Sequence, residues 1–171
     1  KESAKDVGIR PPAGVVEREV RKGIEPKSQV SIVFTGSFQN DEMNRMTLRA
    51  MAEMLSGSLH RTLREELGGT YGVSVEPRFT QRPNESYRIR ISFACDPART
   101  ESLTKTAFDV IEEFRKNGPG DAPVADTRQA LMRDFETNSQ GNRYLLGRLV
   151  YTYQYGEDID AVFNIRPLVN R

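Results

Sequence analysis

The stretch from Leu59 to Val73 holds the side chains of this sequence that are best suited to chemistry: His60, Arg64 and Tyr71. An arginine guanidinium stays charged at any working pH and carries several N–H donors, and a tyrosine phenol carries one O–H donor. Arg64 and Tyr71 stand seven positions apart. Hydrogen-bond donation is therefore the chemistry that this pair offers.

Metal chemistry is excluded by residue type. The sequence has one histidine, His60, and one cysteine, Cys95. A catalytic zinc ion takes about three protein ligands beside an open water position, and its helical motif uses two histidines. A single cysteine allows no disulfide framework and no Cys/His cluster. We expect no metal site and no catalytic residue in this segment, and we expect Cys95 to be a small buried hydrophobe.

Length and charge limit the class of protein. The 171 residues match one domain, since domains run to about 100–200 residues. Lys and Arg number 25 and Asp and Glu 24, so no net field draws nucleic acid or anionic lipid. The longest apolar runs fall far short of the roughly 20 residues that cross a bilayer. We expect neither a nucleic-acid partner nor a membrane span.

The chain reads as a piece of a longer protein. It begins without Met, and its first residues lack the apolar stretch of a secretory signal. Two prolines and two glycines between Gly8 and Gly14 favour an extended tether. We therefore expect residues 1–14 to be a linker from a preceding domain and residues 15–171 to be a single domain, truncated at its C-terminus.

Hydrophobic periodicity predicts the elements that position Arg64 and Tyr71. Residues 15–21 read as a strand of mixed polarity and residues 29–35 as a cleaner strand, because alternate side chains share one face. Residues 41–63 show helical spacing, which places Arg64 at the end of a long helix. Glycines at 68 and 69 then favour a helix end, and residues 71–75 alternate as a strand does.

Downstream, one more strand and several helices are predicted. Residues 87–95 form the clearest strand, and Asp96-Pro97 opens a helix that a Gly-Pro-Gly run ends near residue 118. Further helices are expected over 123–138 and 142–155, the last with Leu146, Leu149 and Tyr153 inward. This order predicts an α+β fold in which helices pack on one face of an antiparallel sheet.

Around Arg64 the sequence resembles the insulinase, or pitrilysin, type of zinc metallopeptidase, a family that includes mitochondrial-processing-peptidase-like proteins. In that family a pattern like Leu-Arg-x-x-x-x-Gly-x-x-Tyr closes a long helix of the domain that lacks zinc and enters the next strand. Leu63, Arg64 and Tyr71 match a close variant of it, although the glycine position differs more. The Pro26-Lys27 lead-in is also similar to the entry of such a domain.

The resemblance implies a C-terminal, non-zinc domain with the metallopeptidase-type α/β roll. In a clamshell peptidase of this kind, one domain holds zinc through an HxxEH helix and a distant glutamate, and a homologous domain closes the chamber. HxxEH is absent here, so zinc is expected in a partner domain of the same chain or in a partner subunit. The segment alone would be inactive, and the parent would hydrolyse peptide bonds, in the bacterial periplasm by resemblance.

The resemblance also assigns a role to the donor pair. Arg64 and Tyr71 would bind the substrate peptide and donate to its carbonyl oxygen as that oxygen gains negative charge. Two plainer interpretations stay open. An arginine at a helix end also suits a cap or an ion pair. A tyrosine two residues before Val73 also suits the core face of a strand.

Two other functions stay open. The first is a scaffold domain of the same fold without catalysis, because non-peptidase core subunits of a respiratory complex resemble this family. The second is a nucleic-acid module that uses arginines beside aromatic residues around the second hairpin, namely Arg78, Arg82, Arg88 and Arg90 beside Phe79 and Tyr87. Alternation favours a solvated sheet face for the strand arginines, and in a clamshell this face could line the chamber.

Overall fold

Three strands build one antiparallel sheet in the computed structural model, which describes residues 5–170. They are β1 (Ser28–Ser37), β2 (Val73–Thr80) and β3 (Ser86–Cys95), in the order β1-β3-β2. Ile91 of β3 pairs with Ile32 of β1 and with Val75 of β2, so apolar residues form a row across the sheet. The alternation predicted from the sequence thus decides which face is buried.

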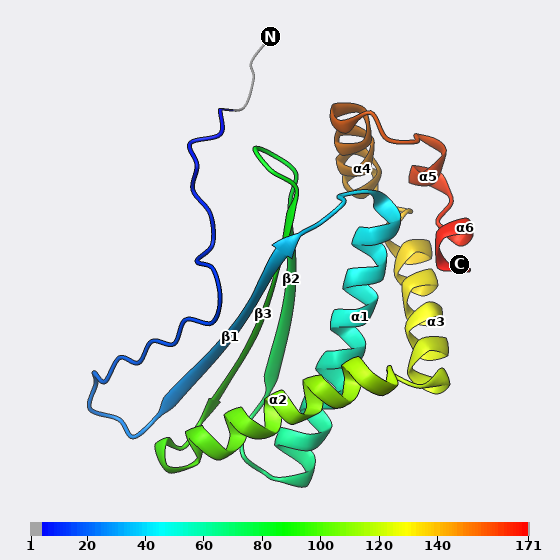
Figure 1. The fold of residues 1–171 in the computed structure, drawn as a ribbon. Coiled ribbons are helices and arrows are strands. Elements are labelled where there is room, and N and C mark those ends of the chain that lie inside the picture. The colour runs from blue at the N-terminus through cyan, green and yellow to red at the C-terminus, as the bar shows by residue number, and fades with distance from the viewer. Residues whose placement is uncertain (1–4, 171) are drawn as a thin grey trace.

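Helices cover that apolar face. Figure 1 shows them gathered on one side of the sheet, which confirms the predicted α+β arrangement with helices on one face. The helical elements are α1 (Glu42–His60), the π-helical turn η1 (Arg61–Glu66), the 3-10 turn η2 (Pro97–Arg99), α2 (Thr100–Asn117), α3 (Asp121–Asn138), α4 (Asn142–Tyr155), and the short α5 (Asp160–Phe163) and α6 (Arg166–Val169). None of these helices is long and apolar enough to cross a membrane.

The core lies between the sheet and its two nearest helices. Strand β3 supplies most of the buried side chains of the sheet, and α1, η1 and α2 supply the facing leucines. The members of this cluster are Val30, Ile89, Ile91, Phe93, Cys95, Leu55, Leu59, Leu63, Leu103 and Ala107. Cys95 is buried among them, as predicted for a small hydrophobe.

The strand predicted for residues 15–21 is wrong. Residues 5–27 form neither helix nor strand, and Val15 and Val20 are exposed. Mixed polarity gives this stretch no continuous apolar side to bury, so no sheet partner is gained. Its described contact with the domain is a hydrogen bond from Asn84 to Asp6. Hydrogen bonds from Arg10, from the Gly8 N–H and from Asn84 hold the pKa of the Asp6 carboxyl well below its usual range.

Helix α4 has the predicted bounds, but two of its three predicted inward residues are exposed, whereas Leu149 is half-buried. Leu146 is 63% exposed and Tyr153 is 84% exposed. The helix instead turns its polar side to α1, because Arg148 donates to Glu42 at 2.5 Å and to the Ala161 carbonyl at 2.8 Å. An ion pair therefore overrides the apolar pattern that the sequence presents.

Candidate functional site

Arg64 lies on a π-helical turn that continues α1. Backbone hydrogen bonds of longer reach than those of an α-helix close the turn. They run from the Leu67 N–H to the Thr62 carbonyl and from the Gly69 N–H to the Leu63 carbonyl. Leu63 is fully buried in the core, whereas Arg64 next to it is exposed. The buried leucine fixes the turn and directs the arginine to solvent. Turns of this type often occur at functional sites.

His60 orients the Arg64 guanidinium. Nη1 of Arg64 lies 2.9 Å from Nε2 of His60, one helical turn earlier. Because an arginine nitrogen only donates, Nε2 must accept, and the imidazole proton then belongs on Nδ1. Nδ1 lies 3.5 Å from a carboxylate oxygen of Glu65, which suits a protonated nitrogen. One arm of the guanidinium is thus held by the imidazole.

The helix end is capped by a different arginine. Arg99 donates from Nη2 to the Leu67 carbonyl at 3.1 Å and from Nη1 to the Gly68 carbonyl at 3.3 Å. Arg64 makes no such bond within the described part of the chain, so the capping interpretation of Arg64 is wrong. Its donors face solvent and His60 instead.

The loop between η1 and β2 is tightly fixed. Gly68 adopts a positive φ of +56°, which a side chain would disfavour. A Cβ on Gly69 would lie 2.5 Å from Cδ2 of Leu103, which is itself buried. The Thr70 hydroxyl donates to the Gly72 carbonyl at 3.0 Å and accepts from the Gly72 N–H at 3.3 Å. The loop is therefore packed against α2 at Gly69, and the Thr70 hydroxyl closes the backbone around Tyr71.

Tyr71 points away from the protein. It is 95% exposed, so its interpretation as a core tyrosine is wrong. Strand β2 begins at Val73 rather than at residue 71, and the alternation that places Val73 and Val75 inward does not reach the tyrosine. The phenol is presented to solvent on a rigid loop.

The two predicted site residues occupy the same junction. Arg64 leaves the π-helical turn and Tyr71 leaves the loop that follows it, and no hydrogen bond joins them in the described structure. Residues 5–170 offer no cluster of three His, Cys, Asp or Glu side chains that could hold a metal ion. The site can therefore donate hydrogen bonds to a ligand, and it supplies no ligand set for zinc.

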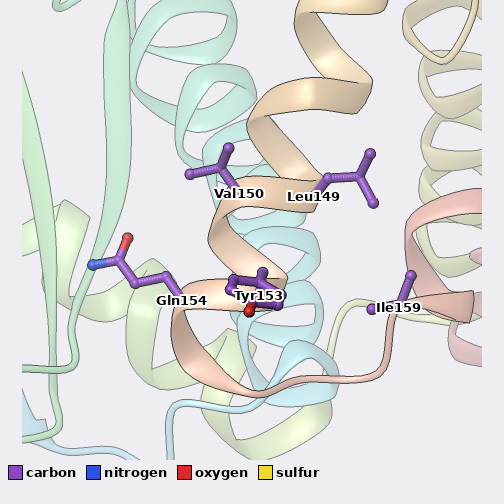
Figure 2. Close-up of a pocket in the computed structure, with 5 residues that line it drawn as sticks. All are labelled: Leu149, Val150, Tyr153, Gln154 and Ile159. Carbon is purple, nitrogen blue, oxygen red and sulfur yellow. The ribbon is translucent and has the colours of Figure 1, made fainter.

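One open hollow lies elsewhere, at the end of α4. It has a volume of about 540 Å³ and is lined by Leu149, Val150, Tyr153, Gln154 and Ile159. Figure 2 shows these side chains spread along the last turns of α4 and the loop that follows. None of these five lining residues is charged.

A second hollow, of about 560 Å³, was not foreseen from the sequence. It lies between α1, α3 and α4 and includes Arg45, Arg49 and Arg148. Arg45 bonds Glu157 at 2.6 Å, and the Arg49 guanidinium lies over the Phe79 ring. Partners that lie over a hundred positions apart leave no local pattern, so spacing could not have revealed this cluster.

Comparison with known families assigns the chain to one of them. Residues 3–131 match the sequence model of the family described as the peptidase M16 inactive domain. The chain belongs to this family. The M16 membership confirms the resemblance drawn from Leu63, Arg64 and Tyr71. Over 118 residues the chain is 27% identical to the probable zinc protease PqqL of Haemophilus influenzae. The aligned region covers 66% of this chain but only 12% of the length of that relative.

Solved structures share the M16 fold. The periplasmic protease PqqL from Escherichia coli matches with a TM-score of 0.74 and 22% identity, over 85% of this chain and 16% of that chain. The ferredoxin protease FusC, in complex with Arabidopsis ferredoxin, matches with a TM-score of 0.74 and 16% identity. The match covers 86% of this chain and 16% of the FusC chain. A peptidase M16 inactive domain from Pseudomonas fluorescens matches with a TM-score of 0.69 and 20% identity. The match covers 84% of this chain and 34% of the Pseudomonas chain.

Proposed function

We propose that this chain is the substrate-enclosing, non-zinc half of a zinc metalloendopeptidase, in which Arg64 and Tyr71 bind the carbonyl of the peptide to be cut. Membership in the M16 inactive-domain family and the zinc-protease names of its relatives support the proposal. The observation that carries it is the 95% exposure of Tyr71 on a loop fixed against α2, beside an exposed Arg64. Neither side chain is needed for the core.

The partner is a zinc-bearing homologous domain, in the same chain or in another subunit, and residues 1–14 would link to a preceding domain. The relatives are several times longer than this chain, which leaves room for such a domain. The zinc ion, held by that partner, would supply the activated water. The Escherichia coli relative is a periplasmic protease, which favours the periplasm as the compartment of this protein.

The chemistry assigned to this chain is stabilisation of negative charge. As water attacks the peptide carbon, its oxygen gains charge, and fixed donors that already point there lower the barrier. His60 holds one arm of Arg64 and leaves its other N–H groups free for the peptide. Tyr71 donates its phenol proton in a hydrogen bond without losing it. Both residues act on the transition state more than on the bound peptide.

The test is peptidase activity with a quenched fluorescent peptide, using this chain mixed with the zinc-bearing half and a chelator control. Replacement Arg64→Ala is expected to lower kcat by about 100- to 1000-fold, as loss of a charge-stabilising donor does elsewhere, with the zinc content unchanged. Tyr71→Phe, which removes only the hydroxyl, is expected to lower kcat in the same direction.

Matched controls are available in the same chain. Arg61→Ala removes an exposed arginine from the same π-helical turn, and Tyr153→Phe removes an exposed hydroxyl from α4. Both should leave kcat unchanged. If turnover is indifferent to Arg64 and Tyr71, or to the presence of this chain, the domain is a scaffold and not a catalytic half.

A further inference from the structure

The face of the sheet that turns away from the helices carries three arginines. Arg78 of β2 and Arg88 and Arg90 of β3 alternate with the buried residues of their strands and are exposed. The helices lie on the other side of the sheet (Figure 1). These three side chains, which we term the arginine face, are therefore free of the packing that fixes the rest of the sheet.

The register brings the arginines together. Arg78 lies directly opposite Arg88 across the β2–β3 pair, and like charges in directly opposed positions destabilise a sheet. Arg90 lies opposite Glu76, but the two do not form an ion pair. Arg90 donates to the Ser31 hydroxyl at 3.2 Å, and Glu76 accepts from the Ser74 hydroxyl at 3.3 Å.

No ion pair joins a carboxylate to the arginine face within residues 5–170, although Glu76 lies across from Arg90. The ion pairs of this part of the chain involve other arginines and His60. The repulsion between Arg78 and Arg88, which face each other, is therefore not relieved by an ion pair in this part of the chain. A ligand that supplies carboxylates would remove the repulsion and gain charge-assisted hydrogen bonds.

The surroundings of the arginine face suit an extended chain. Most of its other outward positions hold short hydroxyl side chains, and the positions on either side of Arg90 hold Val33 and Glu76. The hydroxyl positions are Ser31, Thr35, Ser37, Ser74, Thr80, Ser86 and Ser92. A sheet face with donors along it can accommodate a peptide that alternates acidic and small residues, because such a peptide presents its carboxylates on one side.

We propose that the arginine face binds an extended acidic segment of a peptide, through ion pairs from Arg78, Arg88 and Arg90 to its Asp or Glu side chains. Planar guanidinium groups bind carboxylates in a two-pronged manner, which selects them over neutral side chains. The inference deepens the proposed function, on which it rests, by naming the class of substrate that the enclosing half retains.

A nucleic acid fits this face less well. Binding of single strands needs aromatic platforms beside the cations. The nearby aromatics Phe79 and Tyr87 lie on the helix-covered side, where both contact Phe38. At the described strand positions, the outward side carries no aromatic residue. The net charge of +1 adds no general attraction for phosphate.

The position of the arginine face relative to Tyr71 sets a spacing. Arg78 follows the start of β2 at Val73 by five residues, which is about 17 Å along a strand. An extended peptide bound at Arg64 and Tyr71 that runs beside β2 would reach Arg78 about five to seven residues from the bond to be cut, because Arg78 follows Val73 by five residues and Tyr71 by seven. Acidic residues are expected near that distance.

The experiment measures the binding of fluorescently labelled peptides to the full chain by anisotropy. One peptide carries several glutamates, and its partner has glutamine at each of those positions. The glutamate peptide should bind at least about tenfold more tightly, which corresponds to about 1.4 kcal/mol. The double variant Arg78→Gln/Arg88→Gln should lose this preference, with a circular dichroism spectrum that matches the parent chain.

Two further variants make the test specific. Arg128→Gln/Arg133→Gln removes the same charge from exposed positions of α3 and should keep the preference. Thr35→Glu places a carboxylate opposite Arg88 without removing an arginine, and it should weaken binding of the glutamate peptide. Equal loss in the α3 variant would mean non-specific attraction and would overturn the proposal.

The remaining outcomes separate this inference from the proposed function. Arg64→Ala and Tyr71→Phe should leave the glutamate preference unchanged, because they lie outside the arginine face. Tighter binding of a single-stranded oligonucleotide than of the glutamate peptide would overturn the acidic-peptide assignment. If the parent chain shows no preference for the glutamate peptide, while the reconstituted peptidase turns over a neutral peptide normally, this inference alone is refuted.

Discussion

Tyr71 shows how a short glycine-containing loop decides the position of a single side chain. Its place in the sequence, two residues before an inward valine, fits a core residue as well as a ligand-binding one. The positive φ of Gly68 and the contact of Gly69 with Leu103 turn the backbone out of strand geometry before β2 begins. The tyrosine is therefore presented to solvent, and alternation alone could not predict this.

Replacement of Gly69 by alanine tests whether the loop is as tightly packed as this geometry indicates. The new methyl would overlap buried Leu103, so the free energy of unfolding should fall by about 1–3 kcal/mol, the usual cost of overpacking. Urea denaturation measures it. Gly72→Ala serves as the control, because a Cβ there meets no atom within 4 Å. A similar loss in both variants would mean that backbone freedom, not the contact with Leu103, is what matters.

At the scale of elements, periodicity predicts the type and bounds of a helix or strand, but it does not predict contacts between side chains that lie far apart in the sequence. The predicted strand at 87–95 is observed as Ser86–Cys95, and the predicted helix at 142–155 has the observed bounds. Both predictions rest on local alternation and end signals. The outward turn of Leu146 depends on the bond between Arg148 and Glu42, which are 106 residues apart, and no local pattern encodes such a pair.

The ion pair between Arg45 and Glu157 is expected to hold the C-terminal helices to α1. Its two side chains are 8% and 17% exposed, and the Arg45 guanidinium also donates to Asn40 at 2.9 Å. Arg45→Ala would leave the Glu157 carboxylate buried without its cation. The free energy of unfolding should fall by about 3–5 kcal/mol, the cost of breaking a buried pair by removing one partner.

Chemical denaturation followed by far-UV circular dichroism measures this loss. The control is Arg115→Ala, which breaks an exposed pair with Glu112 on α2 and should change the stability by no more than about 1 kcal/mol. If Arg45→Ala were as mild as this control, the packing of α4 and the segment after it would depend on other contacts, such as those of Arg148 with Glu42 and Ala161.

At the scale of the whole molecule, the fold has one covered and one open sheet face. The sequence predicts that the strand arginines lie on a solvated face, and the register confirms that they lie opposite the core residues. What alternation could not tell is whether carboxylates from elsewhere in the chain would neutralise them. Arg45 and Arg148 find such partners across more than a hundred residues, whereas the arginine face does not within residues 5–170.

If that face retains acidic substrates, the peptidase reconstituted from this chain and the zinc-bearing half should show a salt dependence that varies with substrate charge. Raising the ionic strength from about 0.05 to about 0.5 M shortens the screening length severalfold and weakens exposed ion pairs. For a substrate with glutamates about five to seven residues from the cleaved bond, kcat/KM should then fall about tenfold, mainly through KM, because the contact is made equally in the bound and transition states.

The glutamine version of the same substrate provides the comparison. Its kcat/KM should change little with salt, and Arg78→Gln/Arg88→Gln should make the glutamate substrate behave in the same way. Because Arg64 and Tyr71 act on the reacting carbonyl, their replacement should lower kcat for both substrates at every salt concentration. A salt effect that is equal for the two substrates would mean that charge acts on the assembly of the two halves rather than on the substrate. In that case the three arginines would have no part in substrate choice.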